Sequence, residues 1–300
     1  MRFFASKTLF TACLICVLSS VAFAVNYFIF KYPGVDYFPP GTYLIAIILF
    51  LILLGTYILF GTNSLYFLTI RELIYFLLVM TVIVFATCAV QFTPFHPIDR
   101  QLIAIDNTLS INLQKIMAWT STQPKFKEVL LLSYCSLPYQ MCYIPLALIV
   151  LQKYGYVREY YALLLSTTFI GFLIYYFLPT MGPASFISSS YFFQEQYATG
   201  LKFNELHHYQ LPSTIEGGLI SMPSFHTIWA WLCLYTVRCW PLVFILLLPI
   251  NLLLIAACVL LGWHYFIDLI GSLIVLLVAH SVYFYCVKQY NTTDNDCQVR

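Results

Sequence analysis

The sequence predicts an all-α integral membrane protein with about eight transmembrane helices. Of its 300 residues, 61% are hydrophobic and 9% are charged, which excludes an ordinary soluble domain. Apolar runs of about 20 residues recur, as helices that cross a bilayer require, and no segment shows the alternating pattern of a β-barrel. The expected spans are Leu9–Phe30, Thr42–Phe60, Leu73–Val90, Val129–Leu151, Tyr160–Leu178, Phe225–Val237, Leu242–Leu261 and Phe266–Val287.

The first span resembles a cleaved signal peptide at one point, because Ala22-Phe23-Ala24 imitates a cleavage site. Its apolar stretch continues to Phe30, which favours a retained helix. Most of the ten cysteines lie inside spans and none lies in the outer loops, so we expect no disulfide framework.

Basic residues predict the orientation of the spans. Eight spans place both termini on one face, together with the loops that follow spans two, four and six. The short segments of that face carry eight basic and four acidic residues, whereas the long loops of the other face carry six basic and eight acidic residues. We therefore expect cytoplasmic termini in a cytoplasmic or plasma membrane, with the long loops on the periplasmic, extracellular or lumenal side. Asn291-Thr292-Thr293 matches a glycosylation acceptor but falls on the cytoplasmic side.

Two long loops are expected on the outer face. Between Gln91 and Phe126, apolar residues recur at helical intervals and predict an amphipathic surface helix, which would serve as a packed cover over the bundle or as a lipid gate. They are Leu102, Ile105, Leu109, Leu113 and Ile116. The second loop, from Pro179 to Met222, is rich in aromatic residues, which suit anchoring at the interface or the lining of a lipid entrance.

Two histidines and one carboxylate are the best candidates for chemistry, since ionisable groups at a membrane are rare and usually functional. Asp268 follows His264 by one helical turn, so its carboxylate can hold one ring N–H of the imidazole and fix the tautomer. The other ring nitrogen is then available as a nucleophile or a base. His226 lies at the start of the expected span Phe225–Val237, in the motif Pro223-Ser224-Phe225-His226.

The order of the spans brings these motifs to one edge of the membrane. Span five ends at Pro179–Pro183, span six begins at Pro223–His226, and span seven ends at His264, all on the outer face. Pro223 suits the first turn of a helix, which would leave the amides around Ser224–His226 and the Ser224 hydroxyl to bind phosphate oxygens. His264 would attack phosphorus, and His226 would protonate the leaving alkoxide.

The motifs Pro-Ser-Phe-His at 223–226 and Gly-Trp-His-Tyr-Phe-Ile-Asp-Leu-Ile-Gly at 262–271 resemble the type 2 phosphatidic acid phosphatase superfamily. By this resemblance His264 is the nucleophile, Asp268 its partner and His226 the general acid. The resemblance also implies a six-helix core with the motifs at one face. We expect residues 66–290 to form this catalytic domain, residues 1–65 to add two helices, and residues 291–300 to form a cytoplasmic tail.

The chain departs from the phosphatases at three basic positions. The first motif, a lysine followed by six residues and then Arg-Pro, corresponds to Tyr175 and Gly182-Pro183, and the arginine six residues before the histidine of the third motif corresponds to Cys258. This pattern resembles the branch of inositol phosphorylceramide synthases and sphingomyelin synthases, as do Gly182-Pro183-Ala184 and the segment Asp99…Asp106.

By this resemblance, Ser224, Phe225 and Gly182 are expected to contact the substrate phosphate. Phe225 occupies the place of the family's commoner glycine, where it would narrow the site or line the path of the lipid. Either the outer-loop residues Lys202, His207 or His208 supply the missing cations, or the chain is weakly active.

We therefore expect a membrane enzyme that moves a phosphoryl or phospho-headgroup from a lipid through a phosphohistidine, in the manner of an inositolphosphotransferase. The alternative within the family is a lipid phosphate phosphatase, and a remote one is a non-catalytic proton-coupled transporter. The expected partners are a lipid phosphate or phospholipid and the membrane lipids, without nucleic acid, metal or organic cofactor.

Three further interpretations have less support. His226 and His280 would be axial ligands in a haem protein, although His280 and His96 are more typical of structural and loop residues. Ser224 lacks the Gly-x-Ser-x-Gly elbow of a serine hydrolase. His207 and His208 lack acidic or cysteine companions at metal-ligand spacing.

Overall fold

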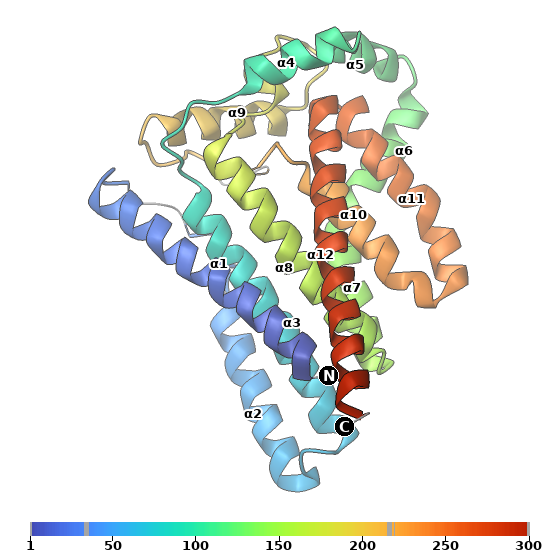
Figure 1. The fold of residues 1–300 in the computed structure, drawn as a ribbon. Helices are drawn as coiled ribbons and strands as arrows, with labels where there is room; N and C mark the ends of the chain where they lie inside the picture. Colours follow the sequence, from blue (N-terminus) through green and yellow to red (C-terminus); the bar gives the residue numbers. More distant parts are fainter. Residues whose placement is uncertain (1, 33–35, 215–217, 219, 299–300) are drawn as a thin grey trace.

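The computed structural model describes residues 2–32, 36–214, 218 and 220–298, and this part of the chain is helical, without a strand. Both termini lie at one end of the bundle, which we call the terminal end, and α4, α5 and α9 lie across the opposite, capped end (Figure 1). The helices are α1 (Arg2–Phe28), α2 (Thr42–Phe60), α3 (Leu65–Val90), α4 (Asp99–Thr108), α5 (Leu113–Ser121), α6 (Pro124–Cys135), α7 (Leu137–Val150), α8 (Tyr154–Phe177), α9 (Gln194–His207), α10 (Phe225–Thr236), α11 (Pro241–Leu260) and α12 (Phe266–Gln298), with 3-10 turns η1 (Pro183–Ser185) and η2 (Val237–Cys239).

Six helices of the described chain are long and apolar enough to cross a membrane, which confirms an all-α integral membrane protein. They lie in α1, α2, α3, α8, α11 and α12. The bent pair α6–α7, with 44° between its halves, makes a seventh if it forms one span. The expected span Val129–Leu151 is therefore divided between two helices. The break lies near Pro138 in the first turn of α7, because proline has no backbone N–H to continue the hydrogen bonding of α6.

The expected count of eight spans is too high, because the expected span Phe225–Val237 is too short to cross a membrane. It is the 12-residue helix α10, about 18 Å long at 1.5 Å per residue, whereas the hydrocarbon core is about 30 Å thick. After the turn η2, Pro241 starts α11, so that α10 and α11 form a V-shaped hairpin (Figure 1). Helix α10 therefore starts at the site and turns back within the bundle.

Helix α8 occupies the centre of the bundle, in contact with α1, α3, α7, α10 and α12. Helix α2 packs on α3 and buries none of its own residues. Helix α12 continues to Gln298, so positions 291–298 of the expected tail extend it, and residues 299–300 lie outside the described chain. The nine described cysteines are all free.

The expected amphipathic surface helix is two helices, α4 and α5. Ser110 takes a left-handed φ of 61° between them, and the Asn112 side chain accepts the Lys115 amide to start α5. Leu102 and Leu113 are buried against the bundle, whereas Leu109 at the break is half exposed. This packing fits a cover over the bundle.

Two carboxylates of the bundle are paired with arginines toward the terminal end. Glu72 of α3, which is fully buried, pairs with Arg158 of α8, and Glu159 pairs with Arg238 just beyond α10. A transmembrane proton relay needs ionisable groups that can exchange protons deep in the spans. These acids instead fasten neighbouring helices to one another.

His280 of α12 takes part in the packing of helices. The Trp231 indole N–H donates to its Nε2 at 3.2 Å, and the Tyr235 ring lies edge-on at 4.7 Å. The nitrogen that a haem iron would need is therefore occupied by a protein donor.

Candidate active site

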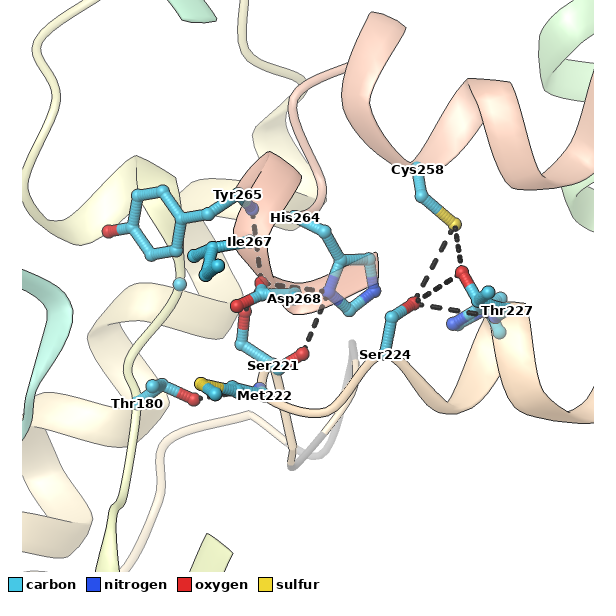
Figure 2. Close-up of polar contacts among 12 residues, drawn as sticks. Thr180, Ser221, Met222, Ser224, Thr227, Cys258, His264, Tyr265, Ile267 and Asp268 are labelled. Carbon is cyan, nitrogen blue, oxygen red and sulfur yellow. Dashed lines mark hydrogen bonds and ion pairs between the residues drawn. The ribbon is translucent and has the colours of Figure 1, made fainter. Parts of the chain in front are cut away.

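The structure brings His264, Asp268 and the loop before α10 together beneath the cap. His264 lies in the turn between α11 and α12, and Asp268 lies in the first turn of α12 (Figure 2). The Ser224 amide donates to the Asp268 backbone carbonyl at 3.4 Å, and the Met222 amide donates to the Thr180 hydroxyl at 3.0 Å. The loop before α10 is thus joined by hydrogen bonds from its backbone amides to α12 and to the segment after α8.

Gly262 is needed for the turn that presents His264. It takes a φ of +79°, and a Cβ there would lie 2.2 Å from Met117 Sδ of α5. Only glycine combines this backbone conformation with so close an approach. The capping helix α5 therefore rests directly on the turn before the histidine.

His264 is held through its Nδ1 atom. Nδ1 lies 2.9 Å from the Ser221 carbonyl oxygen and 3.3 Å from Asp268 Oδ2, and the backbone amide of His264 donates to the Cys258 carbonyl at 2.8 Å. Because a carbonyl oxygen can only accept, the hydrogen belongs on Nδ1, and Nε2 carries the lone pair. Burial lowers the pKa of His264 to about 4, with the Ser221 carbonyl opposing the shift in part.

Asp268 is fully buried and holds its surroundings by accepting hydrogen bonds. Its Oδ2 accepts from the Ser221 hydroxyl at 3.1 Å and from the Tyr265 amide at 3.0 Å, besides its contact with His264. Its Oδ1 has no hydrogen-bond partner among the described residues. One carboxylate oxygen thus fixes both the histidine and the loop that positions it.

His226 lies 6.0 Å from His264 between ring centroids, at an interplanar angle of 58°. Its ring stacks on Tyr134 at 4.2 Å, and Tyr134 stacks in turn on Trp263 at 5.3 Å. The Tyr134 hydroxyl lies 3.3 Å from His226 Nδ1. The sequence does not single out Tyr134 and Trp263, because helix periodicity cannot reveal stacking between residues that are far apart in the chain.

Ser224 is the N-cap of α10, so its hydroxyl is committed to the helix. Its Oγ accepts from the Thr227 amide at 3.4 Å and lies 3.8 Å from Cys258 Sγ. Pro223 therefore precedes the cap and does not occupy the first turn. Among the described residues, no hydrogen bond satisfies the amides of Phe225 and His226, as is normal in the first turn of a helix.

The Phe225 side chain points into the core, where the sequence predicted the lining of a lipid path. It packs edge-on against Phe172 of α8, with ring centroids 5.2 Å apart. Gly171 makes room for it, because a Cβ on that glycine would lie 2.6 Å from Phe225 Cζ. Phe225 stands where the family commonly has glycine, and its ring occupies the space that Gly171 leaves on the surface of α8.

Gly182 holds a protein carboxylate, where the sequence predicted a phosphate. The amides of Gly182 and Met181 both donate to Asp99 at 2.9 Å, and the Tyr265 hydroxyl donates to it at 3.1 Å. Burial raises the pKa of Asp99 to about 6, although these donors oppose the shift. Asp99 thus joins α4 to the loop after α8 and to the turn next to His264.

Asp106, about two helical turns after Asp99 on α4, caps the N-terminus of α12. Its two carboxylate oxygens accept the amides of Phe266 and Ile267 at 2.9 and 3.0 Å. The rarity of acids in this chain and their seven-residue spacing on one helix face are the signals that single out Asp99 and Asp106 in the sequence.

At the positions of the missing cations, the structure has neutral side chains. Tyr175 is fully buried in α8, and Cys258 packs beside Ser224 at the start of α10. Among the suggested substitutes, Lys202 is fully buried in α9, where burial lowers its pKa to about 8. His207 and His208 line a separate cleft.

Comparison with known families decides the relationship. The family model of the PAP2 superfamily matches residues 100–282, which is 183 of the 300 residues. The chain belongs to the PAP2 superfamily. No curated protein and no solved structure gave a significant match.

Membership of the PAP2 superfamily establishes the general class of this protein. It is a membrane protein of a family of lipid phosphatases and phosphotransferases, and its matched region runs from α4 into α12. That region includes His226, His264 and Asp268. Lipids are accordingly its expected substrates and neighbours.

Proposed function

We propose that this PAP2 protein transfers a phosphoryl or phospho-headgroup from a lipid to an alcohol, through a phosphohistidine at His264, in the manner of the inositolphosphotransferase branch. The observation that carries the proposal is the double anchoring of His264 Nδ1 by Ser221 and Asp268. This anchoring leaves the Nε2 lone pair for attack on phosphorus.

The proposed transfer has two steps. In the first, His264 Nε2 forms a bond to phosphorus, the bond to the leaving oxygen breaks, and His226 gives that oxygen a proton. In the second, an acceptor hydroxyl attacks phosphorus, its proton passes to His226, and the bond to His264 breaks. To act as the acid, His226 must start as the imidazolium, so that its Nδ1–H donates to the Tyr134 hydroxyl oxygen and its Nε2–H is given to the leaving oxygen.

The electrostatics favour a phosphodiester substrate. A phosphate monoester carries close to two negative charges at neutral pH, and the phosphatases meet it with cations that this chain lacks. A diester carries one charge. Asp268 would balance the positive charge on His264, and the free amides of Phe225 and His226 at the start of α10 would receive phosphate oxygens.

Orientation and domains belong to the same proposal. We propose that the capped end faces the periplasm, the exterior or a lumen, with both termini in the cytoplasm. Residues 66–290 would then be the catalytic unit, with α1 and α2 as additions, in keeping with a family match that begins at residue 100.

The test uses the full chain purified in detergent and lipids carrying a ³²P-labelled headgroup, with and without alcohol acceptors. We expect an acid-labile, base-stable label on the wild-type protein, a new phospholipid only when the acceptor is present, and the loss of both in His264→Ala. His280→Gln is the matched control, since it removes another helix-packing histidine, partly buried and outside the site, and should keep both signals.

Two results would change the assignment. Free phosphate released at the same rate with or without an acceptor would identify the phosphatase alternative of the family. Product formation that survives in His264→Ala would refute the nucleophile itself.

A further inference from the structure

A second polar cleft opens at the capped end, apart from His264. Its volume is about 670 Å³, and it lies between the loop after α3, the start of α4 and the end of α9. Its polar lining consists of Thr93, His96, Arg100, Gln101, Asn204, His207 and His208. No carboxylate side chain lines it among the described residues, so the cleft suits an anionic ligand.

Arg100 supplies the permanent charge of this cleft. It is exposed and, in the part of the chain that the structure describes, it forms no ion pair, whereas the carboxylate of the preceding Asp99 is directed to the Met181 and Gly182 amides. A guanidinium group is well suited to phosphate because it presents several N–H donors in one plane.

His207 adds a polar ring beside Arg100 in the lining of the cleft. Burial, together with the neighbouring His208 and His96, lowers the pKa of His207 to about 4, so this ring is uncharged near neutral pH. Within the described chain, no three His, Cys, Asp or Glu side chains form a group that could hold a metal ion. The cleft is therefore better matched to an oxyanion than to a cation.

A layer of aromatic side chains separates the cleft from an apolar groove. Phe95 lines the cleft, and its ring packs against Tyr176 at 6.0 Å and Phe177 at 5.4 Å, at the end of α8. These two residues also line a groove of about 230 Å³ between α1 and α8. Figure 1 shows α1, α3 and α8 side by side. The residues of α8 that line the groove extend from Thr168 to Phe177, the last residue of that helix.

The groove has the character of a site for a hydrocarbon chain. Apolar side chains of α1, α3 and α8 make up nearly all of its lining, and the small residues Ala22 and Ala86 leave space between the helices. A polar, positively charged cleft thus adjoins an apolar groove, with one layer of packed aromatic side chains between them.

We propose that the cleft and the groove together bind one anionic phospholipid, with its phosphate at Arg100 and the imidazoles and an acyl chain between α1 and α8. One amphipathic molecule satisfies both halves, because its charged and apolar parts are covalently joined. The proposal needs no chemistry at His264, so it can fail while the proposed function stands, and the reverse is also true.

The test is a titration of the purified full chain with phosphatidylglycerol, followed by native mass spectrometry and run in parallel on His264→Ala to exclude turnover. Glycerol phosphate, inorganic phosphate and diacylglycerol form the other arms. We expect the intact lipid to bind at least tenfold more tightly than any of these fragments. Arg100→Ala and Ala22→Trp should each weaken lipid binding about tenfold, while Lys115→Ala, which removes an exposed cation of α5 outside the cleft, should not.

Several outcomes would overturn the proposal. Unchanged lipid affinity in Arg100→Ala would show that the phosphate does not bind at Arg100. Unchanged lipid affinity in Ala22→Trp would show that the acyl chain does not bind in the groove. Glycerol phosphate binding as tightly as the lipid would reduce the cleft to a site for soluble phosphates. Thermal unfolding of each variant checks that a lost signal reflects lost binding.

Discussion

At His264, the Ser221 carbonyl decides the tautomer and Asp268 supplies the charge. The carbonyl lies closer to Nδ1, at 2.9 Å against 3.3 Å, and it can only accept a hydrogen bond. In the proposed mechanism the carboxylate has a separate task, which is to stabilise the imidazolium that would form when the ring bonds to phosphorus. A substitution that keeps its shape and removes its charge separates the two tasks.

We predict that Asp268→Asn lowers kcat by on the order of 10²- to 10⁴-fold with a small change in KM, by analogy with the loss of a carboxylate behind a catalytic histidine. The reason is that Ser221 still holds the ring while the imidazolium loses its counter-charge. The measurement is steady-state kinetics together with the yield of phosphohistidine. Wild-type kcat in this variant would contradict the role of Asp268.

The pH profile tests the state of His264. Its attack requires a neutral ring, and burial lowers its pKa from about 6.5 to about 4. The pKa is depressed, so the active form persists as the pH falls and is lost only near pH 4. We expect kcat/KM to show no acid-side loss assignable to His264 between pH 5 and 7, whereas an inflection at pH 6.5 that follows this residue would show that burial does not lower its pKa.

Tyr134 is a positioning residue for His226. We predict that Tyr134→Phe, which keeps the stack and removes the hydrogen bond to Nδ1, lowers kcat by about tenfold, as expected for one hydrogen bond in a dry site. The variant should also shift the limb of the pH–rate profile that follows His226, a change that a merely structural role would not produce. An unaltered profile would show that the hydroxyl has no part in proton transfer.

At the scale of elements, helix α4 acts as a brace that organises the motif loops. Its two buried carboxylates lie on one face, and each accepts backbone amides from a different part of the site, Asp99 from the loop after α8 and Asp106 from the start of α12. An acidic side chain at the N-terminus of a helix also interacts favourably with the helix dipole. The brace therefore sets the position of α12, which carries Asp268.

We predict that Asp106→Ala destabilises the fold by about 1 kcal/mol, as for the loss of a helix cap, and lowers activity because α12 begins less regularly. Thermal unfolding and kcat are the measurements. Asn107→Ala, an exposed neighbour on the same helix, is the matched control and should change neither. Equal effects in both variants would remove the special role of the cap.

The elements also show where sequence periodicity is informative. Apolar runs located six membrane-spanning helices, because a bilayer demands a minimum length of apolar helix whatever its neighbours are. They misjudged α10, since its 12 residues are apolar through burial in protein and do not reach across a membrane. Hydropathy cannot separate these two reasons for being apolar.

At the scale of the whole molecule, the common position of the two termini leads to a test of orientation (Figure 1). We predict that Lys115→Cys on the capped end reacts with a membrane-impermeant maleimide in intact cells, and that Lys153→Cys, between α7 and α8, reacts only after the membrane is opened. Both are made in a chain from which the native cysteines have been replaced, so that each label reports one site. The opposite pattern would reverse the proposed orientation.

The sequence alone determined the membrane class and the family, and it predicted the two histidines and the carboxylate as the site, because each depends on local composition or on residues close together in the chain. His264 and Asp268 share one helical turn, so their contact follows from spacing. Tertiary structure decided what surrounds them. Ser221, Tyr134 and Asp99 reach the site from segments far away in sequence. Their roles arise from packing and from the need of buried amides and carboxylates for partners, which no periodicity in the chain encodes.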